Sequence, residues 1–172
     1  MFPRGNTSKK AAYIGVLTGL AVCLSLLERL IPLSSPVPGV KLGLGNVAVL
    51  VTLYSFGGGA AFFVTAVRVL LTGAMYGGLS GIMYGAAGGF LSCLIMLLLK
   101  RTNRPTVIGV SMAGGVFHNA GQIFVAAMIV DNWGMMYYLP GLILSGTAAG
   151  AVTGFCARLL LINLKRLSTT KP

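Results

Sequence analysis

Acidic side chains are the scarcest feature of this 172-residue sequence, in which Glu28 and Asp131 are the only two. An enzyme that handles a diphosphate through Mg²⁺ needs clustered carboxylates to hold the ions, and two isolated acids do not supply them. The sequence also lacks a P-loop, a Gly-x-Gly-x-x-Gly motif with its following acid, and a nucleophile–base pair. We therefore expect a protein that is not an enzyme and does not itself hydrolyse ATP.

Cysteine and histidine are almost as rare, with three cysteines and one histidine. Cys23, Cys93 and Cys156 each lie inside an apolar run, without a Cys-x-x-Cys pair and without a neighbouring histidine. This pattern indicates small apolar side chains in helix packing rather than a metal or redox site. No cofactor and no metal are predicted.

Charge of either sign is also scarce: 9% of the residues are charged, 56% are hydrophobic, and the mean hydropathy is +0.89. Soluble domains are about one quarter charged, and a soluble fold this apolar would expose large hydrophobic patches and aggregate. The composition predicts an all-α integral membrane protein in a lipid bilayer. Its length is that of a single domain, residues 1–172.

Apolar runs separated by Gly, Pro and charged residues predict six transmembrane helices. The second is short: at about 1.5 Å per residue it reaches only about 20 Å, against about 30 Å for the hydrocarbon core. It must therefore begin earlier, near Lys41, or fail to cross fully. The predicted helices span residues 11–33, 44–56, 60–76, 79–99, 107–130 and 138–164, between tails 1–10 and 165–172.

The formal charge of +11 comes from basic residues that lie mostly beside apolar runs. This is the pattern of the positive-inside rule, so we interpret it as a topology signal and expect no nucleic-acid partner. Six crossings place both termini and all three basic clusters in the cytoplasm, with an aromatic belt outside. The clusters are Arg4, Lys9 and Lys10; Lys100, Arg101 and Arg104; and Lys165, Arg166 and Lys171; the outer side holds Arg29, Lys41, Asp131, Trp133, Tyr137 and Tyr138.

Small residues recur four apart on three helices, a spacing that lets helix backbones approach closely in lipid. On the fourth and sixth helices we interpret them as packing within the chain. The first helix differs, because its small face begins at the cytoplasmic edge, where a partner could dock. The three stripes are Gly77, Gly81, Gly85 and Gly89; Gly146, Gly150 and Gly154; and Ala11, Gly15 and Gly19.

Arg68 lies midway along the third predicted helix. An arginine at the bilayer centre costs about 2.5–3.5 kcal/mol on insertion scales, so it should face the bundle interior, a partner or a watery cavity. Two interpretations remain open. Arg68 either forms a structural pair with Glu28 or binds an anion.

Two further polar segments interrupt the apolar sequence. His118, Asn119 and Gln122 lie within one turn of the fifth helix, which favours a polar site over simple packing. Before the second helix, Lys41 and Asn46 lie in a glycine-rich segment whose backbone can approach a ligand closely. With Arg68, these residues should converge on the outer half of the bundle. They predict a pocket for a ligand with an anionic or strongly polar head group.

Four segments resemble the Gx transporter family, often labelled heptaprenyl diphosphate synthase component I: PGVKLGLGN, VTAVRVLLTGAMYG, GVSMAGGVFHNAGQ and YYLPGLILSG. The resemblance covers about residues 11–161. That family is similar to the substrate-binding S components of energy-coupling factor (ECF) importers. The resemblance implies a six-helix bundle of S-component type in the bacterial plasma membrane. It also implies a transmembrane coupling subunit and two ATPase subunits as partners, with the coupling subunit on the small face of the first helix, Ala11, Gly15 and Gly19.

The expected function is capture of a small vitamin-like, isoprenoid or quinone-precursor molecule from outside. The alternative is a non-catalytic membrane accessory subunit of a prenyl diphosphate or quinone pathway, and a third possibility is a stand-alone facilitator. The residues predicted to bind the ligand are Lys41, Asn46, Arg68, His118, Asn119 and Gln122.

Overall fold

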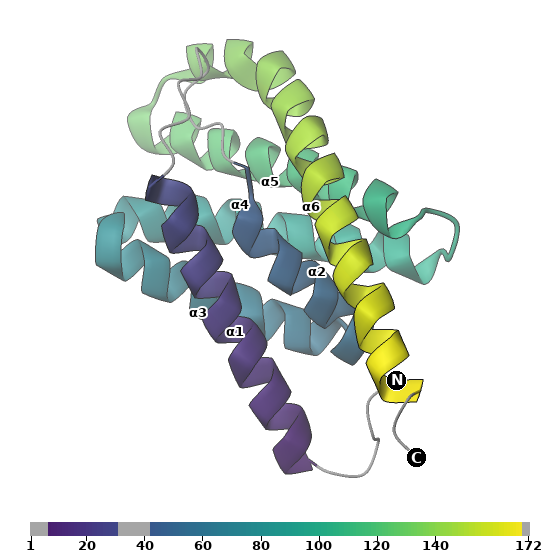
Figure 1. The fold of residues 1–172 in the computed structure, drawn as a ribbon. Helices are drawn as coiled ribbons and strands as arrows, with labels where there is room; N and C mark the ends of the chain where they lie inside the picture. Colours follow the sequence, from purple (N-terminus) through teal and green to yellow (C-terminus); the bar gives the residue numbers. More distant parts are fainter. Residues whose placement is uncertain (1–6, 31–41, 170–172) are drawn as a thin grey trace.

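The computed structural model describes residues 7–30 and 42–169, with side chains up to residue 166. Within these ranges the elements are helical (Figure 1). They follow one another as α1 Thr7–Leu30, α2 Leu44–Phe56, α3 Gly58–Tyr76, α4 Gly78–Arg101, α5 Val107–Val130, the 3₁₀ helix η1 Trp133–Tyr138 and α6 Leu139–Thr169.

The predicted helices 44–56 and 107–130 are found with those bounds, as α2 and α5. α3 and α4 extend beyond the predicted 60–76 and 79–99, and α6 begins at Leu139, one residue later than predicted. Residues 7–10, predicted as part of a tail, form the first turn of α1, and α6 continues past residue 164 to Thr169. Residues 31–33 of the first predicted helix lie outside the described residues. The 3₁₀ helix η1 was not predicted.

The short second helix does not begin near Lys41, because Gly43 precedes it in the left-handed conformation, with φ 71°. Only glycine adopts this conformation without strain, and it ends helical geometry on that side. At 13 residues α2 is about 20 Å long, so it is shorter than the hydrocarbon core. Of the two possibilities left by the sequence, the short helix is the one observed.

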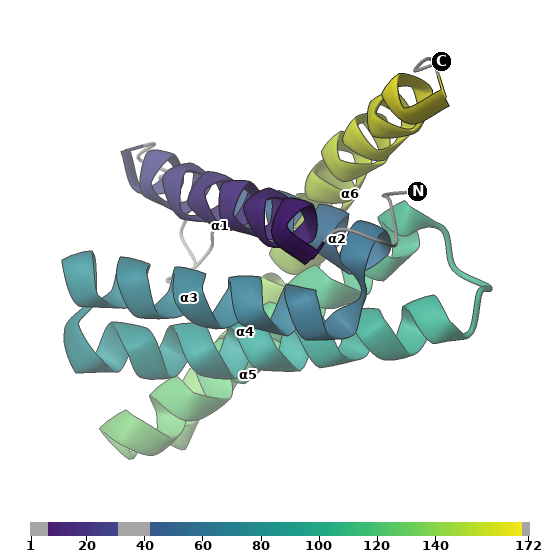
Figure 2. The same cartoon turned by 90° about the horizontal axis from the view of Figure 1, so that it is seen from below.

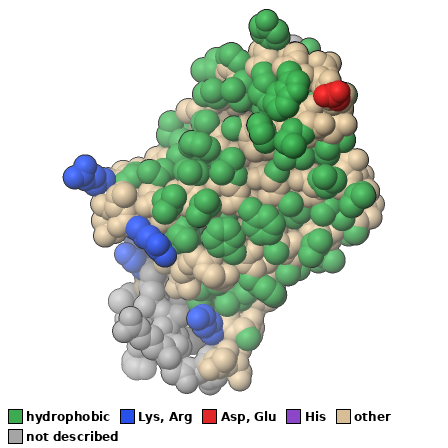
Figure 3. Space-filling view, turned by 180° about the vertical axis from the view of Figure 1, so that it is seen from behind, with side chains coloured by type: hydrophobic (Ala, Val, Ile, Leu, Met, Phe, Trp, Pro, Cys, Tyr) green, Lys and Arg blue, Asp and Glu red, His purple; other side chains and the backbone are tan. Residues whose placement is uncertain are grey.

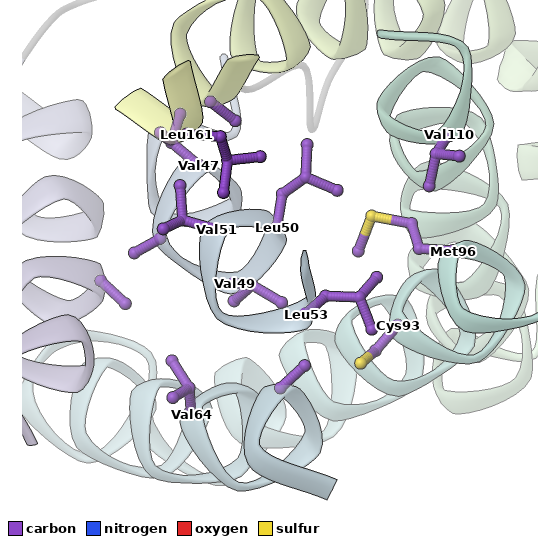
Figure 4. Close-up of a cluster of buried hydrophobic side chains, with 14 residues drawn as sticks. Val47, Val49, Leu50, Val51, Leu53, Val64, Cys93, Met96, Val110 and Leu161 are labelled. Carbon is purple, nitrogen blue, oxygen red and sulfur yellow. The ribbon is translucent and has the colours of Figure 1, made fainter. Parts of the chain in front are cut away.

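α2 forms the centre of the core (Figure 4). Val49, Leu50, Val51 and Leu53 are at most 2% exposed. α2 is apolar on every side, a pattern typical of a core helix or a membrane span, and it packs against α1, α3 and α6. The core is completed by residues of the surrounding helices, among them Val64, Cys93, Met96, Val110 and Leu161.

The other helices surround α2 as an open arc. α3, α4 and α5 run side by side, α1 lies over α3, and α6 crosses the layer steeply while packing on α5 (Figure 2). Five of the helices that the structure describes are long and apolar enough to cross a membrane, with α2 as the shorter sixth. The chain is therefore a multi-pass helical membrane protein.

Side-chain contacts show that successive helices run in alternating directions. At one end, called here the Lys100 end, Lys100 Nζ donates a hydrogen bond to the Leu53 carbonyl near the end of α2, at 2.7 Å. Tyr13, near the start of α1, stacks on Phe56 there. The beginning of α1 and the end of α6 lie on this side in Figure 1.

The opposite end, called here the Trp133 end, joins the end of α1 to the end of α3. The Arg29 guanidinium lies 5.4 Å from the centre of the Tyr76 ring. Trp133 of η1 packs edge-on against Phe124 of α5, at 6.0 Å between ring centres. Trp133 and Tyr137 are exposed, as expected for aromatic side chains at a membrane interface.

The surface between the two ends is apolar. Figure 3 shows hydrophobic side chains over the middle of one face, basic side chains towards one end and an acidic one at the other. Large exposed residues such as Phe63, Leu70, Leu94 and Leu144 belong to this surface. Their exposure is the normal condition of a lipid-facing helix surface.

The glycine stripes of α4 and α6 pack inside the chain. A Cβ added to Gly89 would lie 2.9 Å from Thr65 Cγ2 of α3, and one added to Gly150 would lie 2.6 Å from the Met112 Cα of α5. The stripe on α1 is different, since no atom of the described residues lies within 4 Å of a Cβ added to Gly15 or Gly19. Both are exposed in the structure.

Candidate functional site

A cavity of about 340 Å³ lies between the helices, and all six contribute to its lining. Its walls are rich in glycine and in hydroxyl and amide side chains, and the aromatic residue among them is Tyr84. The volume is near the lower limit of ligand pockets, which is about 300 Å³. The polar and charged lining residues are Ser25, Glu28, Arg29, Asn46, Arg68, Thr72, Tyr84, Ser92, Ser111, His118, Asn119, Gln122 and Thr153.

Arg68 is the charged group deepest in the bundle, and only 7% of it is exposed. Its guanidinium extends between α2 and α4. A Cβ added to Gly45 would lie 2.7 Å from Nη1, and one added to Gly89 would lie 3.8 Å from Nη2. The missing side chain of Gly45 thus leaves the space that the guanidinium occupies, and Gly89 lies at ordinary contact distance on its other side.

Glu28 serves first as a cap for α2. Its two carboxylate oxygens accept hydrogen bonds from the backbone amides of Gly43 and Leu44, at 2.6 and 3.0 Å. A carboxylate is favourable here because the first amides of a helix have no intrahelical partner and carry partial positive charge. Its charge also acts on Arg68 through space. The carboxylate oxygens are thus held by α2 amides, and the guanidinium of Arg68 lines the cavity.

The polar cluster of α5 faces α4 and α6. His118 and Gln122 pack against Gly88 of α4, where an added Cβ would lie 2.7 Å from Gln122 Cγ and 3.1 Å from His118 Nδ1. Asn119 turns the other way: its Nδ2 donates a hydrogen bond to the Leu142 carbonyl of α6 at 2.8 Å. Asn119 is buried and joins two helices, which is a structural role.

Of the six residues predicted to bind a ligand, five line this one cavity: Asn46, Arg68, His118, Asn119 and Gln122. Lys41 lies outside the described residues. Asn46 lies in the first turn of α2, half-buried, beside the amides that Glu28 caps. The structure brings the five together from α2, α3 and α5, and ligand binding by them stays a prediction.

Three hydroxyl groups at the inner part of the cavity were not predicted: Ser92, Ser111 and Thr153. Ser92 is 1% exposed, and its Oγ has no hydrogen-bond partner in the described part of the chain. The sequence does carry a signal for it, since Ser92 interrupts a long apolar run of α4. An isolated serine there resembles one that bonds to its own helix backbone, so the sequence alone does not distinguish the two.

The two acids of the chain hold separate positions. Glu28 binds the α2 amides, and Asp131 is exposed at the end of α5, where its φ is 50°. Among the described residues, no group of three or more His, Cys, Asp or Glu side chains is placed to hold a metal ion. The charged lining residues are Arg29, Arg68 and Glu28, and the remaining polar groups are neutral hydrogen-bonding side chains; two guanidinium groups against one carboxylate suit recognition of a polar anion.

These features define a multi-pass helical membrane protein with a partly open polar cavity between its helices. The sequence model of the heptaprenyl diphosphate synthase component I family matches residues 17–160, and the chain belongs to this family. The family resemblance found in the sequence is thereby confirmed. Neither the search of curated proteins nor that of solved structures gives a match.

Proposed function

We propose that the protein is the substrate-capture subunit of an ECF-type importer and that it binds a small anionic molecule in the cavity. The observation that carries the proposal is the meeting of Arg68, His118 and Gln122 in one cavity of about 340 Å³. A buried arginine is costly in lipid and is found where it meets a partner or an aqueous path. A polar cavity in an otherwise apolar bundle supports binding of a small molecule more than it supports a purely structural role.

The exposed small face of α1 supports assembly with a membrane partner. Gly85 and Gly89 of α4 and Gly146, Gly150 and Gly154 of α6 pack against neighbouring helices, whereas no described residue lies within 4 Å of a Cβ added to Gly15 or Gly19. In lipid, such a face permits close approach of another helix. We propose that Ala11, Gly15 and Gly19 contact the coupling subunit, which binds two ATPase subunits.

The topology of the proposal follows the basic residues. Lys100, Arg101 and Arg104 lie at or just beyond the end of α4, towards the same end as the beginning of α1. We propose that this Lys100 end faces the cytoplasm of a bacterial cell and that the Trp133 end faces outwards. The ligand would then enter from outside, through the end of the cavity near Arg29.

The family description favours a second candidate, a non-catalytic membrane subunit of a prenyl diphosphate synthase. In that case the basic Lys100 end would bind a soluble catalytic partner. Affinity purification from the native membrane separates the two candidates. A transmembrane coupling protein with ATPases supports the importer, and a soluble prenyltransferase without them supports the synthase subunit.

The binding site is tested by native mass spectrometry of the purified protein, which identifies a retained small molecule. Arg68→Lys should lose that molecule as Arg68→Ala does, because Lys cannot replace the two parallel hydrogen bonds of a guanidinium. The matched control is Arg104→Lys, an exposed arginine outside the cavity. Normal retention by Arg68→Ala would exclude the site.

The partner face is tested by replacing Gly15 and Gly19 together with Leu. The isolated variant should fold and bind as before, because among the described residues nothing lies within 4 Å of a Cβ added at either position. Its assembly with the coupling subunit should fail. The outcome against the proposal is full assembly of this variant.

A further inference from the structure

The inner end of the cavity holds hydroxyl groups that form a second polar region, separate from Arg68. Ser92 Oγ points towards α5, since a Cβ added to Gly114 would lie 3.1 Å from it. Ser111 and Thr153 meet there, with 3.0 Å between their hydroxyl oxygens. All three line the cavity and are at most 5% exposed.

The hydrogen bonds at this inner end determine which hydroxyl donors and acceptors remain available to a ligand. The Thr153 hydroxyl donates to backbone carbonyls of its own helix, those of Ala149 and Gly150, at 3.0 and 3.2 Å. Either hydroxyl can donate in the Ser111–Thr153 contact, but both hydrogens are satisfied only when Thr153 donates to a carbonyl and Ser111 donates to Thr153. Ser111 therefore keeps acceptor capacity only, whereas the hydroxyl of Ser92 has no partner among the described residues.

A group placed between these side chains meets one free donor, Ser92, together with acceptors on Ser92 and Ser111. A second anionic group finds no cation there, and an alkyl chain would leave the Ser92 hydroxyl unpaired in the bundle. A hydroxyl or amide of a ligand both donates and accepts, so it satisfies the inner end.

The distance between the Arg68 guanidinium and the inner end of the cavity is estimated from two positions on α4. Gly89 lies beside the Arg68 guanidinium, and Ser92 is three residues further along the same helix. That is about 5 Å, close to one helical turn, and on nearly the same face. The inner end thus lies about one turn deeper than the guanidinium, towards the Lys100 end.

We infer that Ser92 and Ser111 form a second subsite, which selects small anions with a hydroxyl or amide group about 5 Å from the anionic group. This inference rests on the proposed function and names the class of its ligand. Molecules whose inner end is an alkyl or prenyl chain are excluded by the same hydroxyl groups.

The first test asks whether an anion reaches Ser92. Ser92→Cys is made in a chain carrying Cys23→Ala and Cys156→Ala, and the same chain with Ser92 intact reports any reaction of the buried Cys93. The probes are two methanethiosulfonates, one carrying a sulfonate and one a trimethylammonium group. The sulfonate reagent should react with Ser92→Cys at least about tenfold faster than the trimethylammonium reagent. The reason is that the positive charge of Arg68, one helical turn away, attracts the sulfonate strongly at this depth.

Ser55→Cys is the matched control. Ser55 Oγ is also buried without a partner among the described residues, but Ser55 does not line the cavity. It should not react with either probe. The subsite is excluded if Ser92→Cys is as unreactive as Ser55→Cys, or if the trimethylammonium reagent reacts as fast as the sulfonate.

The second test examines selection with Ser92 intact, by protection of Thr72→Cys against the sulfonate reagent; Thr72 also lines the cavity, and the chain again carries Cys23→Ala and Cys156→Ala. γ-Hydroxybutyrate and pentanoate have the same chain length and differ by a hydroxyl in place of a methyl group. The hydroxy acid should protect at about three- to tenfold lower concentration, the value of one neutral hydrogen bond. The selection would be contradicted if the two acids protect equally or if neither protects. It would also be contradicted if farnesyl diphosphate protects at a lower concentration than γ-hydroxybutyrate.

Neither test needs the retained molecule or the partner proteins, so the inference and the proposed function fail separately. Anion-selective labelling without any coupling subunit would leave the subsite standing and exclude the importer. If an importer complex is purified but its Ser92→Cys variant does not react, the importer proposal stands and the subsite is excluded.

Discussion

Replacing Gly150 of α6 with alanine should force α5 and α6 apart. The new Cβ would lie 2.6 Å from both the Met112 Cα and the Ser111 carbonyl oxygen, and 3.0 Å from the Met112 amide nitrogen. All three are backbone atoms, so no flexible side chain can move aside. Inserting a methyl group into a closely packed site costs about 1–3 kcal/mol, and we expect the upper half of this range.

The matched control is Gly19→Ala on α1. Gly19 belongs to a stripe with the same spacing, yet nothing lies within 4 Å of its added Cβ. Alanine is also the better helix former, by up to about 1 kcal/mol. Gly19→Ala should therefore keep or raise stability, although the two sequence patterns are alike.

The assay uses Cys93, which is fully buried in the core. In a chain carrying Cys23→Ala and Cys156→Ala, a thiol-reactive dye becomes fluorescent only when heating exposes Cys93. Gly150→Ala should melt at a clearly lower temperature than its parent, and Gly19→Ala should not. If Gly150→Ala has the same melting temperature as its parent, or if both variants lower the melting temperature equally, the packing of α5 on α6 described here is wrong.

Three further predictions concern single polar residues. Asn119→Leu should lower stability by about 0.5–2 kcal/mol, measured in the same melting assay, because the hydrogen bond from Asn119 of α5 to the Leu142 carbonyl of α6 is lost; unchanged melting would contradict this. Glu28→Gln should cost about 0.5–2 kcal/mol through the weakened cap of α2, and a variant as stable as the parent would count against the cap. In intact cells, an impermeant thiol reagent should label Asn132→Cys and not Asn103→Cys; the reverse pattern would invert the proposed topology.

The sequence predicted the helices well because hydropathy dominates a chain of this composition. α2 and α5 have the bounds expected, since each ends at residues that stop a helix: Gly43 and Gly57 flank α2, and Asp131 with a positive φ follows α5. The ends of α1 and α6 were less predictable. Polar residues such as Lys9 and Lys165 at a helix terminus fit a helical turn and a tail equally well.

From the sequence, a residue of the candidate site was predictable only where its side chain has a high free-energy cost in the lipid hydrocarbon. Arg68, His118 and Gln122 stand out from any apolar sequence, and they line one cavity. The partner of Glu28 was not predictable, because capping of α2 by a side chain of α1 depends on how the two helices pack. Ser92 was missed for a related reason: a serine hydroxyl that bonds to its own helix and one that faces a cavity have the same sequence pattern.

The cavity owes its space to the same glycines that hold the helices together. Gly114, Gly146 and Gly150 line it and also lie against the backbone of a neighbouring helix or against a buried side chain. A side chain at these positions would both separate the helices and fill the cavity. Close packing in lipid and an internal binding space are therefore two results of one pattern of small residues.

The positions of the two acids bear on the family description. An enzyme that handles a diphosphate through Mg²⁺ holds the ions with clustered carboxylates. Here the two acids are apart: both oxygens of Glu28 accept hydrogen bonds from α2 amides, and Asp131 is exposed at the end of α5. If the chain works with such an enzyme, the carboxylates must come from another subunit. What the chain itself presents to a diphosphate or another anion is the guanidinium of Arg68, which can bind two anionic oxygens at once.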